Sequence, residues 1–502
     1  LTTGDYNTAV GHKSLSGEDT GNRNTALGYK TLEVLNYDGN AENTAVGYIA
    51  GASMTTGLRN TLVGAFAGDS ITTGDDNTAI GRAALASEDT GNKNTAIGYS
   101  ALNSLNYDGD GHNTAVGYNA GVFVSTGQNN TLLGSQAGDA LTTGLNNVAV
   151  GYNSLSLEDE HGGNVAVGTN ALRTLNAGAD AYNIAVGNQA GYSATTGIDN
   201  VLVGAASGYA LTTGEKNTAI GRYTLGSEDT GSRNIAIGYW ALKNLNYDGA
   251  GYNVAIGYQA GTTLTTGVYN TIIGGLAGTN LTTGNYNVAL GMQALEAEDA
   301  HGYNTAIGFE ALKTLNAGAN AYNTAVGFQA ARLMSTGVRN TMIGAYAGDA
   351  MTTGVDSVAV GHNALGALTI GNNNVAIGKD ALATSVDGDY NVAVGYEALK
   401  TYEDGDGDGF NTAIGGRAMK LATTAEYNTA VGYNALSAAA TGDYNVIMGY
   451  NAGDALTSGF SNVAIGAHAL TSEDTGARNT AVGYAALGNL NYDGNGNNVA
   501  VG

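Results

Sequence analysis

The sequence contains no cysteine and no proline. Without cysteine a disulfide scaffold is excluded, while both extracellular and cytosolic locations stay open. No stretch approaches the eighteen or so consecutive apolar residues that a membrane-spanning helix needs. No positively charged segment followed by an apolar one opens the chain, so the pattern of a secretory signal is not visible. The residues therefore indicate no membrane insertion in this segment.

Positive charge is also scarce. The chain has 19 Lys and Arg residues against 43 Asp and Glu residues, which gives a formal net charge of −24. Nucleic acid and anionic membranes would be repelled at long range unless a local basic patch intervened, and we find no such patch. We therefore expect no nucleic-acid partner.

Glycine, in contrast, is abundant, with 79 of the 502 residues, and hydrophobic residues make up 43% of the chain. A glycine content of this kind without proline fits neither collagen nor a proline-bearing linker, and the apolar content is enough to bury a core. The chain begins inside a loop motif, Leu1-Thr2-Thr3-Gly4, and stops at the end of another, Asn498-Val499-Ala500-Val501-Gly502. We interpret it as a segment of a longer protein.

A pentapeptide, Asn-Thr/Val-Ala-Val/Ile-Gly, recurs along the whole chain in 29 copies, from Asn7 to Asn498. The copies follow a 17-residue spacing, interrupted by 19-residue spacings and by a single 20-residue spacing. A longer, 70-residue period makes the following positions equivalent: Asn7, Asn77, Asn147, Asn217, Asn287 and Ser357. We number each repeat from its Asn as position 1. Periods of this kind are typical of solenoids, which stack one short unit on the next.

Such a short repeat cannot hold a helix-turn-helix unit, and it has no apolar positions at helical spacing. Alternation within the pentapeptide predicts a short strand, with β-branched positions 2 and 4 on one face and small position 3 on the other. The glycine at position 5 predicts a corner with positive φ or a close approach of two backbones. A second short strand is expected at segments such as 48–50. The fold class predicted is all-β, a parallel β-solenoid of 17- to 20-residue coils, and such ladders explain the absence of proline.

Residue volumes alternate along the repeat. Position 3 is normally Ala, but at one phase of the 70-residue period it is large, at Leu62, Leu132, Leu202, Ile272 and Met342. In the same coils position 6, often Tyr elsewhere, becomes Ala65, Ser135, Ala205, Gly275 and Ala345. We interpret this as an exchange of volume across one shared packing surface. A later coil, which pairs Ile447 with Tyr450, departs from the pattern.

One continuous solenoid over 1–502 is the expected domain organisation. Residues 1–356 follow the regular 70-residue period, the coils of 357–461 are shifted in register, and 462–502 return to the regular pattern. The shifted part contains the single 20-residue spacing, between Asn391 and Asn411. A duplication scar is the favoured explanation, with a bend or a binding site as alternatives.

The segments Asn-Thr-Ala-Val-Gly-Tyr at 113–118 and Asn-Val-Ala-Ile-Gly-Tyr at 253–258 resemble the YadA-like (Hep/Hag) head repeats of trimeric autotransporter adhesins. Similar repeats occur in phage tail fibres and other surface fibres. The resemblance covers almost the whole chain, although the family's repeats are typically shorter than the 17-residue repeat of this chain. It implies a left-handed parallel β-roll, three chains assembled into one rod, and a role in holding binding regions away from a surface.

An enzyme needs convergent acid, base or nucleophile groups. The six histidines are scattered along the chain, at positions 12, 112, 161, 301, 362 and 468. His12 and His362 share the coil position that holds Tyr elsewhere, which predicts a surface-facing filler. We therefore predict no catalytic residue, no cofactor-binding residue and no enzymatic function.

The acidic run Asp404-Gly405-Asp406-Gly407-Asp408-Gly409 matches the opening of an EF-hand loop, because alternating carboxylates can wrap Ca²⁺. Its twelfth position is Gly415 instead of a bidentate Glu, and no helix pattern flanks it. Plain turn residues are the alternative. If Asp404, Asp406 and Asp408 bind Ca²⁺, we expect Asp406→Ala to lower the melting temperature only when Ca²⁺ is supplied.

Threonine recurs at position 2, in a column that could present a flat array to ice or to another repetitive surface: Thr8, Thr25, Thr44, Thr61 and Thr78. The same position becomes Val148, Val165, Ile184 and Val201 in later coils, which we interpret as an inward-facing β-branched site. A Thr-array surface is therefore not expected.

The expected function is an extracellular structural or adhesive fibre segment at a cell or virion surface. The alternative is a self-assembling filament in which coils of successive subunits stack end to end, since exposed solenoid ends are sheet edges. We expect copies to wind side by side into a homo-oligomer, three by the family resemblance, through the small residues of position 8: Ala50, Ala67, Ala84, Ala101 and Ala120. The surface receptor is unknown.

Overall fold

The computed structural model describes residues 3–403 and 407–502. The chain divides into two compact units, Leu1–Tyr252 and Asn253–Gly502. Within the described residues the secondary structure consists of 29 strands of three residues each, and no helix is present. Accordingly, no helix there is long and apolar enough to cross a membrane.

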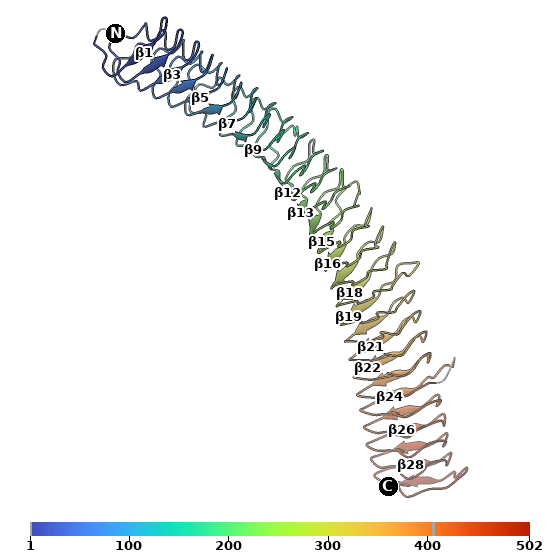
Figure 1. Ribbon diagram of the computed structural model, residues 1–502. Helices are drawn as coiled ribbons and strands as arrows, with labels where there is room; N and C mark the ends of the chain where they lie inside the picture. The colour runs from blue at the N-terminus through green and yellow to red at the C-terminus, as the bar shows by residue number, and fades with distance from the viewer. Residues whose placement is uncertain (1–2, 404–406) are drawn as a thin grey trace. The chain divides into compact units, whose positions relative to one another are not determined.

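The first unit carries fourteen strands, one in each coil (Figure 1). Their bounds are β1 Thr8–Val10, β2 Thr25–Leu27, β3 Thr44–Val46, β4 Thr61–Val63, β5 Thr78–Ile80, β6 Thr95–Ile97, β7 Thr114–Val116, β8 Thr131–Leu133, β9 Val148–Val150, β10 Val165–Val167, β11 Ile184–Val186, β12 Val201–Val203, β13 Thr218–Ile220 and β14 Ile235–Ile237.

The second unit carries fifteen strands. Their bounds are β15 Val254–Ile256, β16 Thr271–Ile273, β17 Val288–Leu290, β18 Thr305–Ile307, β19 Thr324–Val326, β20 Thr341–Ile343, β21 Val358–Val360, β22 Val375–Ile377, β23 Val392–Val394, β24 Thr412–Ile414, β25 Thr429–Val431, β26 Val446–Met448, β27 Val463–Ile465, β28 Thr480–Val482 and β29 Val499–Val501.

Within each unit every strand pairs in parallel with the next strand along the chain, at the same coil position. In the first unit Thr8 lies opposite Thr25, and in the second unit Val392 lies opposite Thr412 across the 20-residue spacing. The prediction of an all-β parallel solenoid built on a 17-residue coil is confirmed. Backbone bonds between coils continue outside the strands, as where Lys30 N–H donates to the carbonyl of His12 at 3.0 Å. A proline would remove one of these donors, which accounts for its absence.

The Asn at position 1 forms a buried hydrogen-bond ladder that the sequence analysis did not assign. Oδ1 of Asn130 accepts the backbone N–H of Asn147 at 2.9 Å. Nδ2 of Asn130 donates to the carbonyl of Gly144 in the loop of its own coil, also at 2.9 Å. Buried polar groups need such partners, and here one side chain joins the strand to the next coil and to its own loop.

The glycine at position 5 fulfils both parts of its prediction. Gly64 has φ of +140°, in the region that favours glycine. A Cβ on Gly64 would also lie 2.5 Å from the carbonyl oxygen of Gly81 in the next coil. Stacked backbones therefore come too close at this corner for any side chain.

The predicted second strand is wrong. Residues 48 and 49 form a bend and residue 50 a turn instead of a strand, and Ile49 has φ of +61°. A left-handed residue at this position turns the chain, so an extended pair of residues cannot form there. The repeat thus contains one strand and a long turn-rich return.

The core of most coils is built from positions 3, 8, 9 and 12. In the second coil these are Ala26, Thr31, Leu32 and Leu35, all fully buried. The inward residue of the strand is therefore the small one, and the β-branched residues at positions 2 and 4 face outward. Ile220 at position 4 is 37% exposed, whereas Ala219 beside it is fully buried.

Candidate functional site

The outward face of the strands is the first candidate for an interaction surface. The Thr residues of position 2 lie on this face: Thr44 and Thr61 are half-buried there. Ala45, at position 3, points inward and is fully buried. The coil interior is narrow and is filled from the opposite side by the Leu side chains of positions 9 and 12, which leaves room for only Ala at most copies of position 3. The argument that the Thr column points inward is therefore wrong.

The small residues of position 8 do not form a surface strip. Ala50, Ala67, Ala84, Ala101 and Ala120 are all fully buried inside their own coils. A neighbouring chain cannot approach them, so the expected contact strip is wrong. The physical reason is that position 8 lies across the coil interior and packs with positions 3 and 9.

Stacked aromatic side chains lie along parts of the edges of the outward sheet face. In the first unit His12 at position 6 stacks on Tyr29 with ring centroids 5.5 Å apart, and Tyr29 stacks on Tyr48 at 5.2 Å. His12 therefore does occupy the outer Tyr column, as predicted. In the second unit the residue before the Asn forms a similar column, where Tyr286 stacks on Tyr269 at 5.0 Å and on Tyr303 at 5.1 Å.

Charged side chains do not occur at the centre of this face in the part of the chain that the structure describes. No described strand in either unit contains Asp, Glu, Lys or Arg at position 2 or 4. Charge lies instead in the turns and beside the Asn, as in the ion pair of Arg23 with Glu42 at 2.8 Å. Within each unit the face is thus a pair of uncharged columns of Thr, Val, Ile and Leu, with Met448 in one strand of the second unit.

A second feature is a set of buried glutamates at position 12, where most other coils have Leu or Met. They are Glu18, Glu88, Glu158, Glu228, Glu298 and Glu473, each at most 1% exposed. Every one of them precedes a 19-residue coil. Sequence reasoning missed them, although an acidic residue repeated at an otherwise apolar core position is a visible signal.

The carboxylates of these glutamates accept backbone donors around the longer loop. Oε1 of Glu228 accepts the N–H of Gly231 at 2.8 Å, and Oε2 accepts the N–H of Tyr247 in the next coil at 3.4 Å. The extra residues of the longer coil thus find an acceptor in the coil below. Burial raises the pKa of Glu228 to about 7, and it also raises the pKa of Glu88 and of Glu158.

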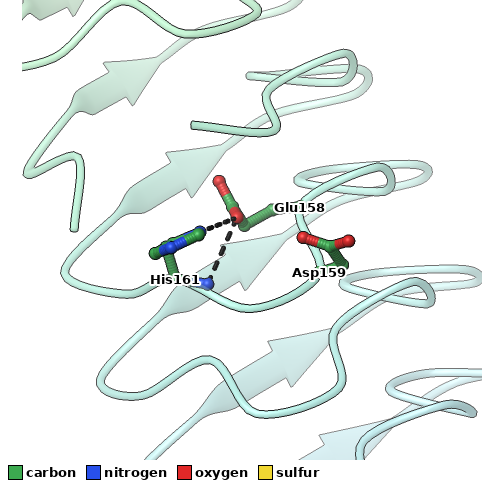
Figure 2. Close-up of side chains that lie close together, drawn as sticks. All are labelled: Glu158, Asp159 and His161. Carbon is green, nitrogen blue, oxygen red and sulfur yellow. Dashed lines mark hydrogen bonds and ion pairs between the residues drawn. The ribbon is translucent and has the colours of Figure 1, made fainter. Parts of the chain in front are cut away.

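Two of the six glutamates lie in clusters with a histidine. Oε1 of Glu158 is 3.5 Å from Nδ1 of His161, and the ligand atoms of Glu158, Asp159 and His161 all lie within 4.8 Å of one another (Figure 2). The same arrangement recurs two 70-residue periods later in Glu298, Asp299 and His301. His161 and His301 lie in separate units, but they occupy equivalent coil positions, each beside a buried carboxylate, which the sequence analysis did not predict.

The predicted calcium ligands are only partly described. Asp404 and Asp406 lie outside the described residues. Asp408 is exposed and pairs through its backbone with Asp389 in a parallel bridge. The calcium site therefore stays a prediction. A weaker acidic cluster of the same kind, in the loop 108–111, is engaged with protein donors, since Asp108 accepts the hydroxyl of Thr90 and Asp110 pairs with Lys93.

Comparison with protein-family models finds no match, and a search of curated proteins finds no entry that matches.

Proposed function

We propose that this chain is a structural or adhesive fibre segment of an extracellular surface, in which copies pack side by side through the outward sheet face. The observation that carries the proposal is the uncharged pair of columns at positions 2 and 4 in each unit, with stacked aromatic rings along part of its edges. A repetitive β-solenoid is typically a structural fold. No catalytic role is proposed for any residue.

The size of the face supports a partner. In the first unit three-residue strands make a strip about 10 Å wide, and fourteen coils at ~4.8 Å spacing make it about 60 Å long, on the order of 600 Å². Nine of its fourteen strands have Thr at position 2, so the strip is uncharged but mixed in polarity. Its area is at the upper end of the largest patches on monomeric proteins, about 300–600 Å², which are often functional. The strip by itself approaches the area that one partner contributes to a stable interface, about 800 Å².

The distribution of charge also supports this face as the contact between copies. A net charge of −24 on each copy opposes association, so copies would meet where carboxylates are absent. The sheet face satisfies this condition, because the charged side chains lie in the turns and on its edges. Three is the proposed number of copies, and this number rests on the resemblance to trimeric adhesin heads.

Light scattering at moderate salt tests the assembly. The expected result is a solution mass near three times the 50.4 kDa of one chain. Ile220→Asp places a charge on the face and is expected to lower the mass toward that of a monomer, whereas Leu145→Asp, at an exposed turn position, is expected to leave it unchanged. A stable wild-type monomer would refute the proposal, and indefinite filaments in electron micrographs would favour end-to-end assembly.

A further inference from the structure

The two histidine clusters occur where the chain departs from its own pattern. Four of the six buried glutamates are followed by Asp-Thr-Gly, with Gly at positions 21, 91, 231 and 476. In the other two the Gly is replaced by His161 or His301. At the same two places the loop of the next coil changes from Asn-Tyr-Asp-Gly to Asn-Ala-Gly-Ala, at 176–179 and 316–319. Histidine and the smaller loop thus occur together twice, separated by two 70-residue periods.

Replacing the glycine weakens the hydrogen bonding of a buried carboxylate. A Cβ on Gly231 would overlap the carboxylate of Glu228, so a histidine there forces the carboxylate away. The N–H of Gly231 donates to Glu228 at 2.8 Å, but the N–H of His161 donates to Glu158 at 3.3 Å. A fully buried carboxylate with a longer, poorer bond is destabilising unless another group compensates.

In the first cluster the imidazole does not compensate as a hydrogen-bond partner, whereas in the second Nδ1 of His301 is hydrogen-bonded to Oε1 of Glu298 at 3.3 Å. Nδ1 of His161 is buried, lies 3.5 Å from Oε1 of Glu158 and has no hydrogen-bond partner. Asp159 adds a second carboxylate, with an oxygen within 4.8 Å of a ligand atom of Glu158 and of one of His161. In the first cluster two carboxyl groups and an unpartnered ring nitrogen thus converge, and a bound cation would favour the ionised form of both carboxyl groups.

We propose that Glu158, Asp159 and His161 bind one divalent transition-metal ion such as Zn²⁺, and that Glu298, Asp299 and His301 bind a second one. Tetrahedral Zn²⁺ with bonds of about 2.0–2.2 Å places neighbouring ligand atoms about 3.3–3.6 Å apart. The separations of Nδ1 and Oε1 are 3.5 Å in the first cluster and 3.3 Å in the second. The half-buried Asp supplies the third ligand by rotation of its carboxylate, and water completes the shell.

The donor set selects the class of metal. Imidazole nitrogen favours Zn²⁺ and related first-row ions, while Ca²⁺ takes six to eight oxygen ligands. Ligation by Nδ1 requires the ring proton to be on Nε2. Oε2 of Glu158 also accepts the backbone N–H of Ala177, in the next coil, at 3.2 Å. A metal bound to Glu158 would therefore stabilise the contact between these two coils.

Titration of chelator-treated, dialysed protein with Zn²⁺ alone, followed by calorimetry, tests the proposal. We expect two equivalents bound per chain and a higher unfolding temperature in Zn²⁺ than in chelator. The matched variant is His161→Gly with His301→Gly, which restores the residue that the other four coils use and is therefore expected to fold. It should lose both equivalents and the rise in unfolding temperature, and each single variant should keep one equivalent.

Three outcomes would overturn the proposal. Wild-type protein that binds no Zn²⁺ leaves the clusters as hydrogen-bonded pairs. A double variant that keeps both equivalents places the ion elsewhere, for example at the four remaining histidines. A response to Ca²⁺ that is lost in the double variant would assign the clusters to calcium instead of a transition metal.

Discussion

Ile447 packs against Gly453: a Cβ on this glycine would lie 3.3 Å from Cδ1 of the isoleucine. Gly453 is position 9 of its coil, which elsewhere holds a buried Leu such as Leu85 or Leu102. The large residue at position 3 therefore fills the space that a missing Leu side chain leaves. Tyr450 lies on the outer face at 52% exposure and takes no part in the exchange.

The same pairing explains the volume alternation in the rest of the chain. Leu62 extends its two δ methyl groups toward Gly51 and Gly68, the position-9 residues of the preceding coil and of its own. Exchange therefore takes place between positions 3 and 9 across the core. The interpretation that position 6 was the partner is wrong, because Ala65 lies on the outer face with Tyr48 and its other counterparts. Ile447 therefore follows the same exchange of volume between positions 3 and 9.

Leu62→Ala is expected to destabilise its coil by about 2–5 kcal/mol, because Leu62 is fully buried and the glycines beside it cannot fill the cavity. Amide hydrogen exchange over residues 44–80 measures the local loss. The matched control is Leu145→Ala, since Leu145 is 42% exposed and its truncation is expected to change stability by much less. Equal effects of the two substitutions would contradict the burial of Leu62.

Asn130→Ala is expected to be among the most damaging polar truncations, because it leaves the N–H of Asn147 and the carbonyl of Gly144 buried without partners. Each such group costs about 1–3 kcal/mol. Asn130→Ser should cost less, since Ser357 stands at the equivalent position of another coil and its hydroxyl oxygen accepts the N–H of Asn374 at 3.2 Å. The two variants can be ranked by denaturant unfolding, and a serine variant as unstable as the alanine one would contradict the ladder's role.

The sequence was sufficient to predict the coil period, the strand positions and the glycine corner, because each depends on residues that recur in every repeat. It did not predict which face is buried. The usual rule places β-branched residues such as Val46 inside and small ones such as Ala45 anywhere, but the narrow coil reverses it. Position 9 was not recognised because its buried Leu, as in Leu32, has positive φ, which bulky residues rarely adopt.

The candidate sites depend on contacts between neighbouring coils. The sequence of a single repeat does not show which residues of the next coil it contacts. Glu158 and the backbone N–H of Ala177 meet only because the coils stack. The histidines could have been recognised by their separation, since His161 and His301 differ by twice the 70-residue period.

Glu397 offers a first test of pH dependence. Hydrogen bonds from Lys400 at 2.8 Å, and the contact with Lys420 at 2.7 Å, lower the pKa of Glu397 to about 2. Because the folded pKa lies below the ordinary value of 4.5, the ionised carboxylate stabilises the fold above about pH 4.5 and this contribution is lost as the pH falls toward 2. Glu397→Gln should therefore be less stable than wild type at neutral pH. The difference in unfolding temperature should shrink on acidification, and a difference that grew would contradict the assignment.

Glu228 should show the opposite dependence. Burial raises its pKa to about 7 from an ordinary value of 4.5, so between these pH values the folded chain binds more protons at this site than the unfolded chain. Stability at this coil should then rise as the pH falls from about 7 to about 4.5, because a neutral carboxyl is favoured in the core.

Glu228→Gln removes the titrating proton and keeps the volume. The check is local hydrogen exchange over residues 217–253 in both proteins across this pH range, with wild type gaining protection relative to the variant on acidification. Leu368, the buried leucine at the same position of a coil with a 17-residue successor, provides the control site, where protection should show no such difference between the two proteins. If the wild type instead loses protection relative to the variant on acidification, the carboxylate is held ionised by its backbone donors, and the assignment of a raised pKa is wrong.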